Sequence, residues 1–133
     1  MSKIYLEIVT PDRLFFEGEI DSIIVRGIEG DLAILKGRTP IVTPLAIGKL
    51  RVFRDDEESI ASVTDGYVSA IDDKVTIVTD AAEWPGEIDI DRAEEARKRA
   101  ERRLEKTTGT DYDRAEAALK RSLNRLEVGK YKK

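Results

Sequence analysis

The sequence predicts an α+β fold, in which an N-terminal β-sandwich (residues 1–86) is followed by a C-terminal antiparallel two-helix hairpin (residues 87–133). Short runs rich in β-branched residues, separated by turn signals, recur as far as Trp84-Pro85-Gly86, and such spacing is typical of sandwiches and barrels. Beyond that tripeptide, apolar residues recur every three or four positions, as in amphipathic helices. A chain of 133 residues therefore accommodates one sandwich-sized domain and a hairpin more naturally than two full domains.

The first strand is predicted where Ile4, Leu6 and Ile8 alternate with more polar residues, because a period of two marks a strand with one buried face. Turn signals then follow at Thr10-Pro11-Asp12, Gly18, Gly27 to Gly30, Gly37 to Pro40, Asp55 to Glu58, Asp65-Gly66 and Asp72-Asp73. The strands expected between them cover residues 20–25, 32–35, 47–53, 60–64, 67–71 and 75–78.

Pro40 and Pro44 bracket residues 41–43. Proline has no N–H to donate to a neighbouring strand, so it is confined to sheet edges and bulges. We therefore expect this segment at an edge or in a loop and not in the middle of a sheet.

Composition excludes several kinds of chemistry. The chain has no Cys and no His, which removes disulfides, thiolate nucleophiles, the usual zinc ligands and the commonest proton shuttle. Residues 1–7 enter the first strand without the apolar segment of a signal peptide, and no apolar run approaches the ~18 residues that a membrane span needs. We expect a soluble, cytoplasmic protein without a metal site.

Asp89 is a plausible N-cap for the first helix, whose apolar face consists of Ile90, Ala93, Ala96, Ala100 and Leu104. A break is expected at residues 107–110, and Thr110 or Asp111 is expected to cap the second helix. The face of that helix consists of Tyr112, Ala115, Leu119, Ser122 and Leu126, with Ala118 and Leu123 beside it. Gly129 is expected to end the helix, and the short connector predicts an antiparallel hairpin.

Alanine dominates the apolar face of the first helix. Burying one methyl group contributes about 0.8 kcal/mol, against about 1.5 to 3 kcal/mol for a leucine or isoleucine side chain, whereas alanine has the highest helix propensity. Two interpretations stay open. The small residues permit close helix packing, or the hairpin is stable as helices but leaves the β body at low cost, which predicts a conformational switch.

Charge is distributed unevenly along the chain. Residues 1–86 hold 9 Lys and Arg against 16 Asp and Glu, a net charge of −7, whereas residues 87–133 hold 14 against 11, a net charge of +3. The basic hairpin is either a solvated surface with ion pairs at three- and four-residue spacing or an anion site.

The arginine spacing bears on these two interpretations. Arg92 and Arg99 are seven residues apart, about 10 Å along a helix, and Asp89 and Glu95 lie three or four positions from them. Ion pairing within the helix is therefore sufficient to account for these two arginines.

Arg121 and Arg125 differ, because no carboxylate lies three or four residues from either of them. They need a partner from elsewhere in the chain, or have only water. If the hairpin closes, guanidinium groups from both helices converge, and their bidentate donors suit a polyphosphate.

Three segments of the chain resemble a known protein family. They are Ile8-Val9-Thr10-Pro11-Asp12, then Gly30-Asp31-Leu32-Ala33-Ile34-Leu35 with Gly37 and Pro40, then Thr64-Asp65-Gly66-Tyr67-Val68. Their order, the chain length and the helical hairpin together are similar to the epsilon subunit family of bacterial F-type ATP synthases, over nearly the whole chain.

The resemblance implies a noncatalytic central-stalk (rotor) subunit of a proton-driven ATP synthase, peripheral at the cytoplasmic face of the plasma membrane. In the family, the sandwich docks on the gamma subunit and on the membrane rotor ring, the c-ring. The hairpin of bacterial members extends along gamma towards the alpha/beta catalytic hexamer and inhibits ATP hydrolysis. In some members, bound ATP holds the hairpin folded.

The family's ATP motif is Ile or Leu, Asp, any two residues, Arg, Ala, and residues 88–93 match it at every specified position. By resemblance, regulatory ATP, with or without Mg²⁺, is bound by Glu83, Asp89, Arg92, Ala93, Arg99, Arg121 and Arg125. Three of these residues also have a purely structural interpretation, since Asp89 fits an N-cap, Glu83 a solvated loop acid and Ala93 a packing residue. The chain lacks a Gly-rich phosphate loop, so this site is expected to sense ATP without hydrolysing it.

One segment departs from the family pattern. The chain has Gly37-Arg38-Thr39-Pro40 where members often have Gly-His-x-Pro, so no role of that histidine is carried over to Arg38. If inhibition occurs, Arg114, Lys120, Arg121 and Arg125 are candidates for contacts with acidic surface on the catalytic subunits, and such contacts weaken with salt.

Two further classes of protein fit the sequence less well. An adaptor that binds nucleic acid or anionic membrane through the basic hairpin is opposed by the interleaved acidic residues, the scarcity of aromatic residues and the small apolar face. An enzyme is opposed because paired carboxylates such as Asp72-Asp73 look like a hairpin turn, with no base or substrate site beside them.

Overall fold

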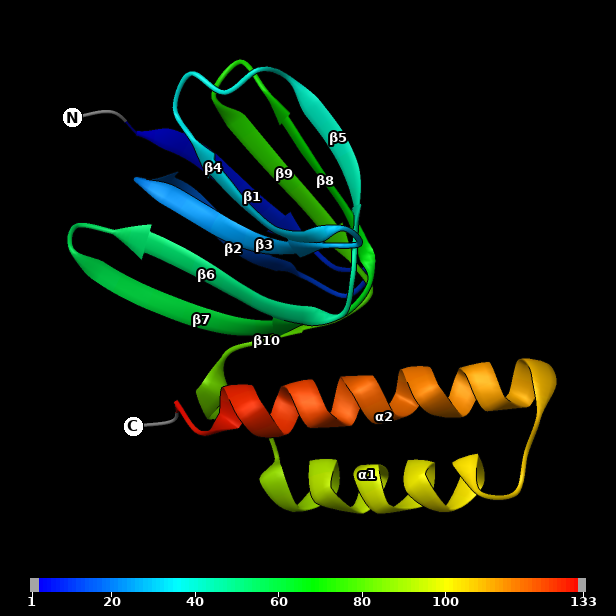
Figure 1. Cartoon of the computed structure of the whole chain (residues 1–133). Coiled ribbons are helices and arrows are strands. Elements are labelled where there is room, and N and C mark those ends of the chain that lie inside the picture. Colours follow the sequence, from blue (N-terminus) through cyan, green and yellow to red (C-terminus); the bar gives the residue numbers. More distant parts are fainter. Residues whose placement is uncertain (1–2, 132–133) are drawn as a thin grey trace. The chain divides into compact units, whose positions relative to one another are not determined.

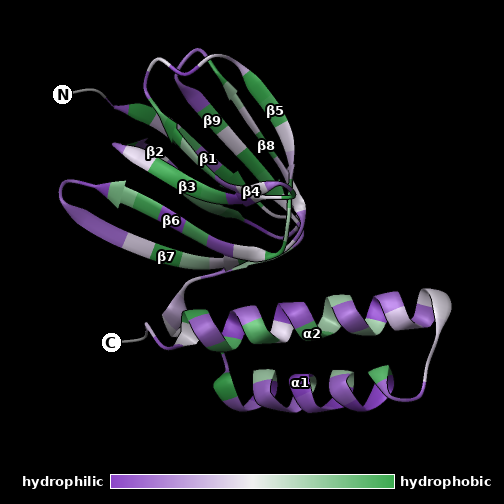
Figure 2. Cartoon of the chain, viewed as in Figure 1, coloured by the Kyte–Doolittle hydropathy of each residue, from purple (hydrophilic) through white to green (hydrophobic). Residues whose placement is uncertain are grey.

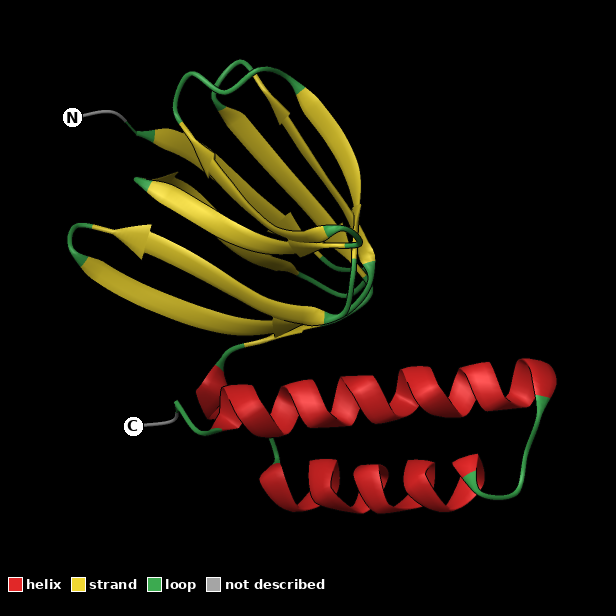
Figure 3. Cartoon of the chain, viewed as in Figure 1, coloured by secondary structure: helices red, strands yellow, loops and turns green. Residues whose placement is uncertain are grey.

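The computed structural model describes residues 3–131. The chain forms two compact units, the first ending at Ala82 and the second beginning at Glu83 (Figure 1). The first unit is built of strands and the second of helices (Figure 3), so the predicted α+β fold is confirmed.

The strands are β1 (Ile4–Val9), β2 (Leu14–Ile20), β3 (Ser22–Gly27), β4 (Gly30–Leu35), β5 (Ile41–Leu45), β6 (Gly48–Arg54), β7 (Glu57–Val63), β8 (Gly66–Ile71), β9 (Lys74–Thr79) and β10 (Ala82–Glu83). They form one hydrogen-bonded sheet in the order β10-β7-β6-β3-β5-β8-β9-β1-β2, with β4 paired to β3. The strand pairs β1–β2, β3–β4, β3–β6, β5–β8, β6–β7 and β8–β9 are antiparallel, whereas β1 and β9 pair in parallel.

The sheet curls into a sandwich-like body with one face inside, and its strands accordingly alternate buried and more exposed residues. In β1, Ile4, Leu6 and Ile8 are buried and the residues between them are partly exposed. The same alternation of buried and more exposed residues continues along β3, β6 and β9. Figure 2, which is coloured by hydropathy, shows hydrophobic and hydrophilic residues interleaved along β6. Burial of one face therefore fixes the strand register, since a slip of one residue would turn the core residues outward.

Two tight turns use aspartate in the left-handed region. Asp55 and Asp56 have φ of 51° and 66° between β6 and β7, and Asp72 and Asp73 have φ of 51° and 62° between β8 and β9. Two-residue hairpin loops of this kind match the twist of the strands, and Asp tolerates positive φ better than most residues. The interpretation of Asp72-Asp73 as a hairpin turn is confirmed.

Residues 41–43 lie in β5, which pairs with β8 along its length and with β3 at Gly27–Leu45 alone. These three residues are thus paired on one side, as at a sheet edge, which is the position that Pro40 and Pro44 predict, although Leu45 links β5 to β3. Two local predictions are wrong. Gly18 lies within β2, where a turn was expected. The second helix begins at Gly109 with Thr108 as its N-cap, so Thr110 and Asp111 lie in its first turn.

The second unit contains the 3₁₀-helix η1 (Pro85–Glu87) and the helices α1 (Ile90–Leu104) and α2 (Gly109–Gly129). α1 and α2 pack side by side. The end of α2 lies at the start of α1, since a Cβ on Gly129 would come 2.3 Å from Cδ1 of Ile90. The antiparallel hairpin and its end at Gly129 are confirmed.

Small residues are buried in this hairpin: Ala93, Ala100, Ala115, Ser122 and Gly129. Close packing of small residues is thus what the structure shows, whereas low-cost release of the hairpin stays a prediction. Over residues 3–131, no helix combines the length and the apolar character that crossing a bilayer requires.

Candidate functional site

The predicted ligand residues gather on the helical unit, and the first of them begins α1. Asp89 has extended backbone angles, and its Oδ1 accepts a hydrogen bond of 3.1 Å from the backbone N–H of Arg92. This bond satisfies one of the N–H groups that the first turn of a helix leaves unpaired. Asp89 is therefore the N-cap of α1, as the sequence predicts.

Glu83 and Arg125 form the main ion pair of the site. Nε of Arg125 donates to Oε1 of Glu83 at 2.7 Å, and Nη2 donates to Oε2 at 3.0 Å. Both side chains are about three-quarters buried, with 27% of Glu83 and 26% of Arg125 exposed. Arg125 thus has the partner from elsewhere in the chain that its local sequence lacks, and Glu83 is more than a solvated loop acid.

Arg92, Arg99 and Arg121 are exposed, and none of them forms an ion pair within residues 3–131. The expectation that Asp89 and Glu95 neutralise Arg92 and Arg99 is therefore wrong. Asp89 is turned to the backbone as a cap, and Glu95 has no ion pair in the described part of the chain.

The carboxylates that do form pairs in α1 serve a different arginine. Arg97 is held by Glu94 and Glu101, with Nε of Arg97 donating to Glu94 at 2.8 Å. Hydrogen bonding from Arg97 lowers the pKa of the Glu94 carboxyl. In α2, Lys120 pairs with Glu116 at 3.6 Å.

A repeated tripeptide accounts for this separation of charges. Arg-Ala-Glu occurs at residues 92–94, 99–101 and 114–116, each time around a buried alanine. Successive residues of a helix are about 100° apart, so the arginine and the glutamate flank the buried alanine on opposite sides. Two antiparallel helices are related by a local two-fold axis perpendicular to the plane that contains both helix axes. A residue that directly precedes an inward-facing residue therefore lies on the same side of this plane in either helix.

The hairpin therefore has a basic side and an acidic side. We define the basic side by Arg92, Arg99, Arg114, Arg121 and Arg125, of which Arg121 directly precedes buried Ser122. The acidic side carries Glu94, Glu101 and Glu116 with their partners Arg97 and Lys120.

Helix geometry places arginines from both helices at similar heights. The contact between Ile90 and Gly129 sets the register. At 1.5 Å per residue, Arg99 lies about 13 Å along α1 from Ile90, and Arg121 lies about 12 Å back along α2 from Gly129. The two exposed guanidinium groups are thus level with each other, an arrangement that suits phosphate better than any single arginine.

The motif alanine, Ala93, has a different place. Its side chain is fully buried in the hairpin. A larger residue there would push α1 away from its neighbour, so Ala93 is a packing residue in this conformation.

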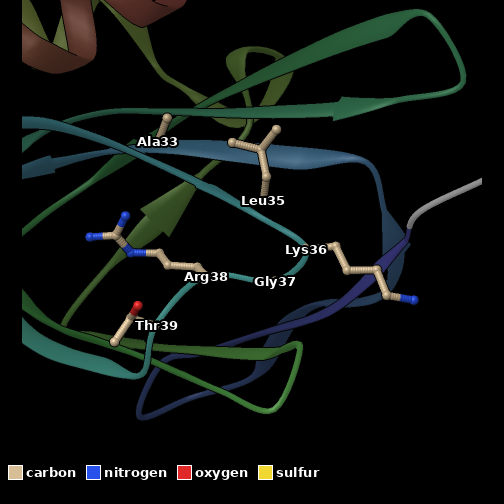
Figure 4. Close-up of a pocket in the computed structure, with 6 residues that line it drawn as sticks. All are labelled: Ala33, Leu35, Lys36, Gly37, Arg38 and Thr39. Atoms are coloured by element: carbon tan, nitrogen blue, oxygen red, sulfur yellow. The ribbon is translucent and has the colours of Figure 1, made fainter.

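A pocket in the first unit offers an alternative place for an anion. It has a volume of about 450 Å³ and is lined by Ala33, Leu35, Lys36, Gly37, Arg38 and Thr39. Figure 4 shows the Lys36 and Arg38 side chains leaving this loop in opposite directions. The backbone N–H of Gly37 donates to Asp73. Because the cationic groups do not converge, this pocket is a weaker anion site than the basic side.

Sequence reasoning found the arginines and the cap but missed how they are paired. The residues of the Glu83–Arg125 pair are 42 positions apart, and no local pattern signals such a contact. The Arg-Ala-Glu repeat, in contrast, is visible in the sequence and predicts the two-sided hairpin once the alanines are taken as buried.

Family comparisons cover both units. Residues 3–85 match the family described as ATP synthase, Delta/Epsilon chain, beta-sandwich domain, and residues 87–130 match its long alpha-helix domain. An ATP synthase epsilon chain of Alkaliphilus metalliredigens is 50% identical over 105 residues, which are 79% of this chain and 78% of that protein. One from Caldicellulosiruptor saccharolyticus is 41% identical over 111 residues, 84% of this chain and 81% of that protein.

Solved structures share the fold. A chain in the Euglena gracilis mitochondrial ATP synthase structure of OSCP, F1 and c-ring has a TM-score of 0.85 over 98% of this chain and 83% of that chain, at 23% identity. A chain of the Tetrahymena thermophila mitochondrial ATP synthase central stalk and c-ring structure has a TM-score of 0.61 over 95% and 92%, at 18% identity.

Proposed function

Since the chain belongs to the ATP synthase delta/epsilon family, we propose that it is an epsilon chain of the central stalk, a noncatalytic rotor subunit whose helical hairpin senses ATP and restrains ATP hydrolysis. The observation that supports sensing is the basic side of the hairpin. Of its five arginines, four have no ion pair within residues 3–131: Arg92, Arg99, Arg114 and Arg121.

We assign the sandwich to docking. In this proposal the first unit contacts the gamma subunit and the c-ring, and the protein reaches the cytoplasmic face of the plasma membrane through the complex. Pull-down on purified gamma subunit tests the assignment, with polyanion resin as the comparison. Retention on the resin but not on gamma would instead favour an adaptor for anionic surfaces.

In the proposed site, guanidinium groups neutralise the phosphates. Arg92 and Arg99 from α1 and Arg121 and Arg125 from α2 supply planar donors that match phosphate geometry. Carboxylates repel phosphate, so Asp89 and Glu83 act on the nucleoside or on the arginines. Holding both helices through one ligand favours the closed hairpin, because a ligand stabilises the state that it binds.

Calorimetric titration with ATP, with and without Mg²⁺, tests this proposal. The basic-side variant is Arg92→Ala, and the matched control is Arg97→Ala, which removes an arginine from the opposite side of the same helix. We expect saturable binding that Arg92→Ala weakens at least tenfold and Arg97→Ala leaves within about twofold, since phosphate contacts are charge-assisted hydrogen bonds. Equal losses in both variants would point to helix stability as the cause, and no binding by the unaltered protein would reject ATP sensing.

The open hairpin is proposed to inhibit hydrolysis by contacting acidic surface of the catalytic hexamer. Lys120 is a weaker candidate than the sequence suggests, because it pairs with Glu116 on the acidic side. Arg114 and Arg121 lie on the basic side and remain candidates. Inhibition of the assembled enzyme should weaken as salt rises, and inhibition unchanged by Arg114→Gln with Arg121→Gln would count against the contact.

A further inference from the structure

The Glu83–Arg125 pair uses one particular edge of the guanidinium group. Nε of Arg125 donates one hydrogen bond to Oε1 of Glu83, and Nη2 donates one to Oε2. A guanidinium group has five N–H donors, so Nη1 and the second hydrogen of Nη2 stay available. Within residues 3–131 no protein group accepts from them.

The position of Arg125 makes its free N–H donors suitable for binding phosphate. Arg125 lies one helical turn from Arg121, on the same face of α2. Its side chain is about three-quarters buried, whereas Arg92, Arg99 and Arg121 are exposed. Among these four arginines it is the one that the protein already holds in a fixed orientation.

From this geometry we propose that Glu83 is a positioning residue for phosphate: it acts on the ligand through Arg125 and makes no contact with the nucleoside. This inference rests on the proposed function and specifies how one residue of that site works. Glu83 fixes the plane of the Arg125 fork, and the remaining Nη1–Nη2 edge receives a phosphate oxygen.

Two effects of Glu83 on an anion oppose each other. Its negative charge repels phosphate, but the charge is already paired with Arg125, and solvent and salt screen what remains near the surface. Because Glu83 already orders the Arg125 side chain, ligand binding does not carry the loss of conformational entropy of that side chain. Arginine has one of the largest side-chain entropies. The ordering effect is the larger, so loss of Glu83 weakens binding.

A direct nucleoside contact is the competing role, and the two roles respond differently to ligand chemistry. A carboxylate that binds ribose or base affects ATP but not inorganic tripolyphosphate. A carboxylate that acts through Arg125 affects both ligands by the same factor, and its effect disappears when residue 125 no longer has a planar fork.

The experiment is a double-mutant cycle with Glu83→Gln and Arg125→Lys, titrated with ATP and with tripolyphosphate on the full chain. Arg125→Lys keeps the charge but removes the bidentate fork. Glu94→Gln is the matched control, since it makes the same charge change in an ion pair on the acidic side. Helix content by circular dichroism identifies any variant whose hairpin is lost.

We expect Glu83→Gln to weaken both ligands about tenfold, to have no further effect in the Arg125→Lys background, and to leave helix content unchanged. In NMR spectra without ligand, the Nε–H signal of Arg125 should exchange slowly with water in the unaltered protein and fast in Glu83→Gln. Tighter binding in Glu83→Gln, a loss confined to ATP, or a loss that persists with Lys at position 125 would each overturn the assignment. Failure of the unaltered protein to bind either ligand would reject the proposed function itself.

Discussion

Gly129 at the end of α2 lies directly against Ile90 at the start of α1. A Cβ on Gly129 would come 2.3 Å from Cδ1 and 3.6 Å from Cγ1 of Ile90, and 3.7 Å from Cγ2 of Ile88. Only hydrogen fits there without movement, so this contact brings the base of the hairpin together. It also sets the register that makes Arg99 level with Arg121.

The first prediction follows from this contact. Gly129→Val should destabilise the hairpin by about 1 to 3 kcal/mol, because extra methyl groups in a close-packed contact force side chains out of their rotamers. Hydrogen exchange of the α1 and α2 amides measures the effect. Ile90→Ala should partly rescue Gly129→Val, and additive losses in the double variant would show that the two residues do not contact each other.

The second prediction separates the two roles of Asp89. Asp89→Ala should lower the stability of α1 by about 1 kcal/mol, because the N-cap bond to Arg92 is lost, whereas Asp89→Ser should retain most of it. Circular dichroism and amide exchange in the first turn measure the cap. ATP titration of Asp89→Ser then decides the second role, since a capped helix with lost ATP affinity would show that the carboxylate itself serves the nucleotide.

The third prediction concerns Gly66 in the sandwich. A Cβ at this position would lie 1.9 Å from the backbone oxygen of Val78 and 2.8 Å from Cα of Thr79, which pairs with Gly66 across β8 and β9. Backbone cannot move aside as a side chain can, so Gly66→Ala should cost about 3 kcal/mol or more of unfolding free energy. Urea denaturation measures it. Gly86→Ala is the control, because nothing lies within 4 Å of its Cβ position, and similar losses at the two glycines would contradict the steric argument.

The fourth prediction is a pH dependence at the Lys3–Asp21 ion pair of 2.9 Å. Hydrogen bonds from Lys3 and then from the backbone N–H of Asp55 lower the pKa of the Asp21 carboxyl. A carboxyl whose pKa is lower in the folded state adds stability above its unfolded pKa of about 3.9, and this stability is lost as the pH falls through the folded pKa.

Urea unfolding at pH 6 and again below pH 3 checks this dependence. The unaltered protein should be more stable than Asp21→Asn at pH 6, and the difference should shrink at the lower pH. Glu57→Gln is the control, because Glu57 is exposed and has no ion pair within residues 3–131. A difference between the unaltered protein and Asp21→Asn that is constant with pH would exclude the carboxyl as its source.

Much of the fold is predictable because its signals are local. The alternation of Ile4, Leu6 and Ile8 predicts β1, and the spacing of Ala93 and Ala100 predicts the buried face of α1. Failures occur where a neighbouring strand overrides the local signal. Gly18 reads as a turn but lies opposite Leu6 in the β1–β2 pair.

The same distinction holds for the candidate site. The motif at residues 88–93 and the arginines of the second helix predict which residues belong to it. The expected ion pairs of Arg92 and Arg99 do not form. Spacing along one helix shows which charged residues are neighbours, but it does not show which donor a carboxylate accepts a hydrogen bond from. Asp89 serves the backbone of Arg92.

By itself, the sequence determined the order of strands and helices, the capped start of α1, and the separation of charge by the Arg-Ala-Glu repeat, since each depends on residues within a few positions of one another. Only the tertiary structure decided that Glu83 holds Arg125, that β5 pairs with β8, and that Gly129 meets Ile90. These contacts join residues that are distant along the chain, 42 positions apart for Glu83 and Arg125, and their partners are chosen by packing and not by local pattern.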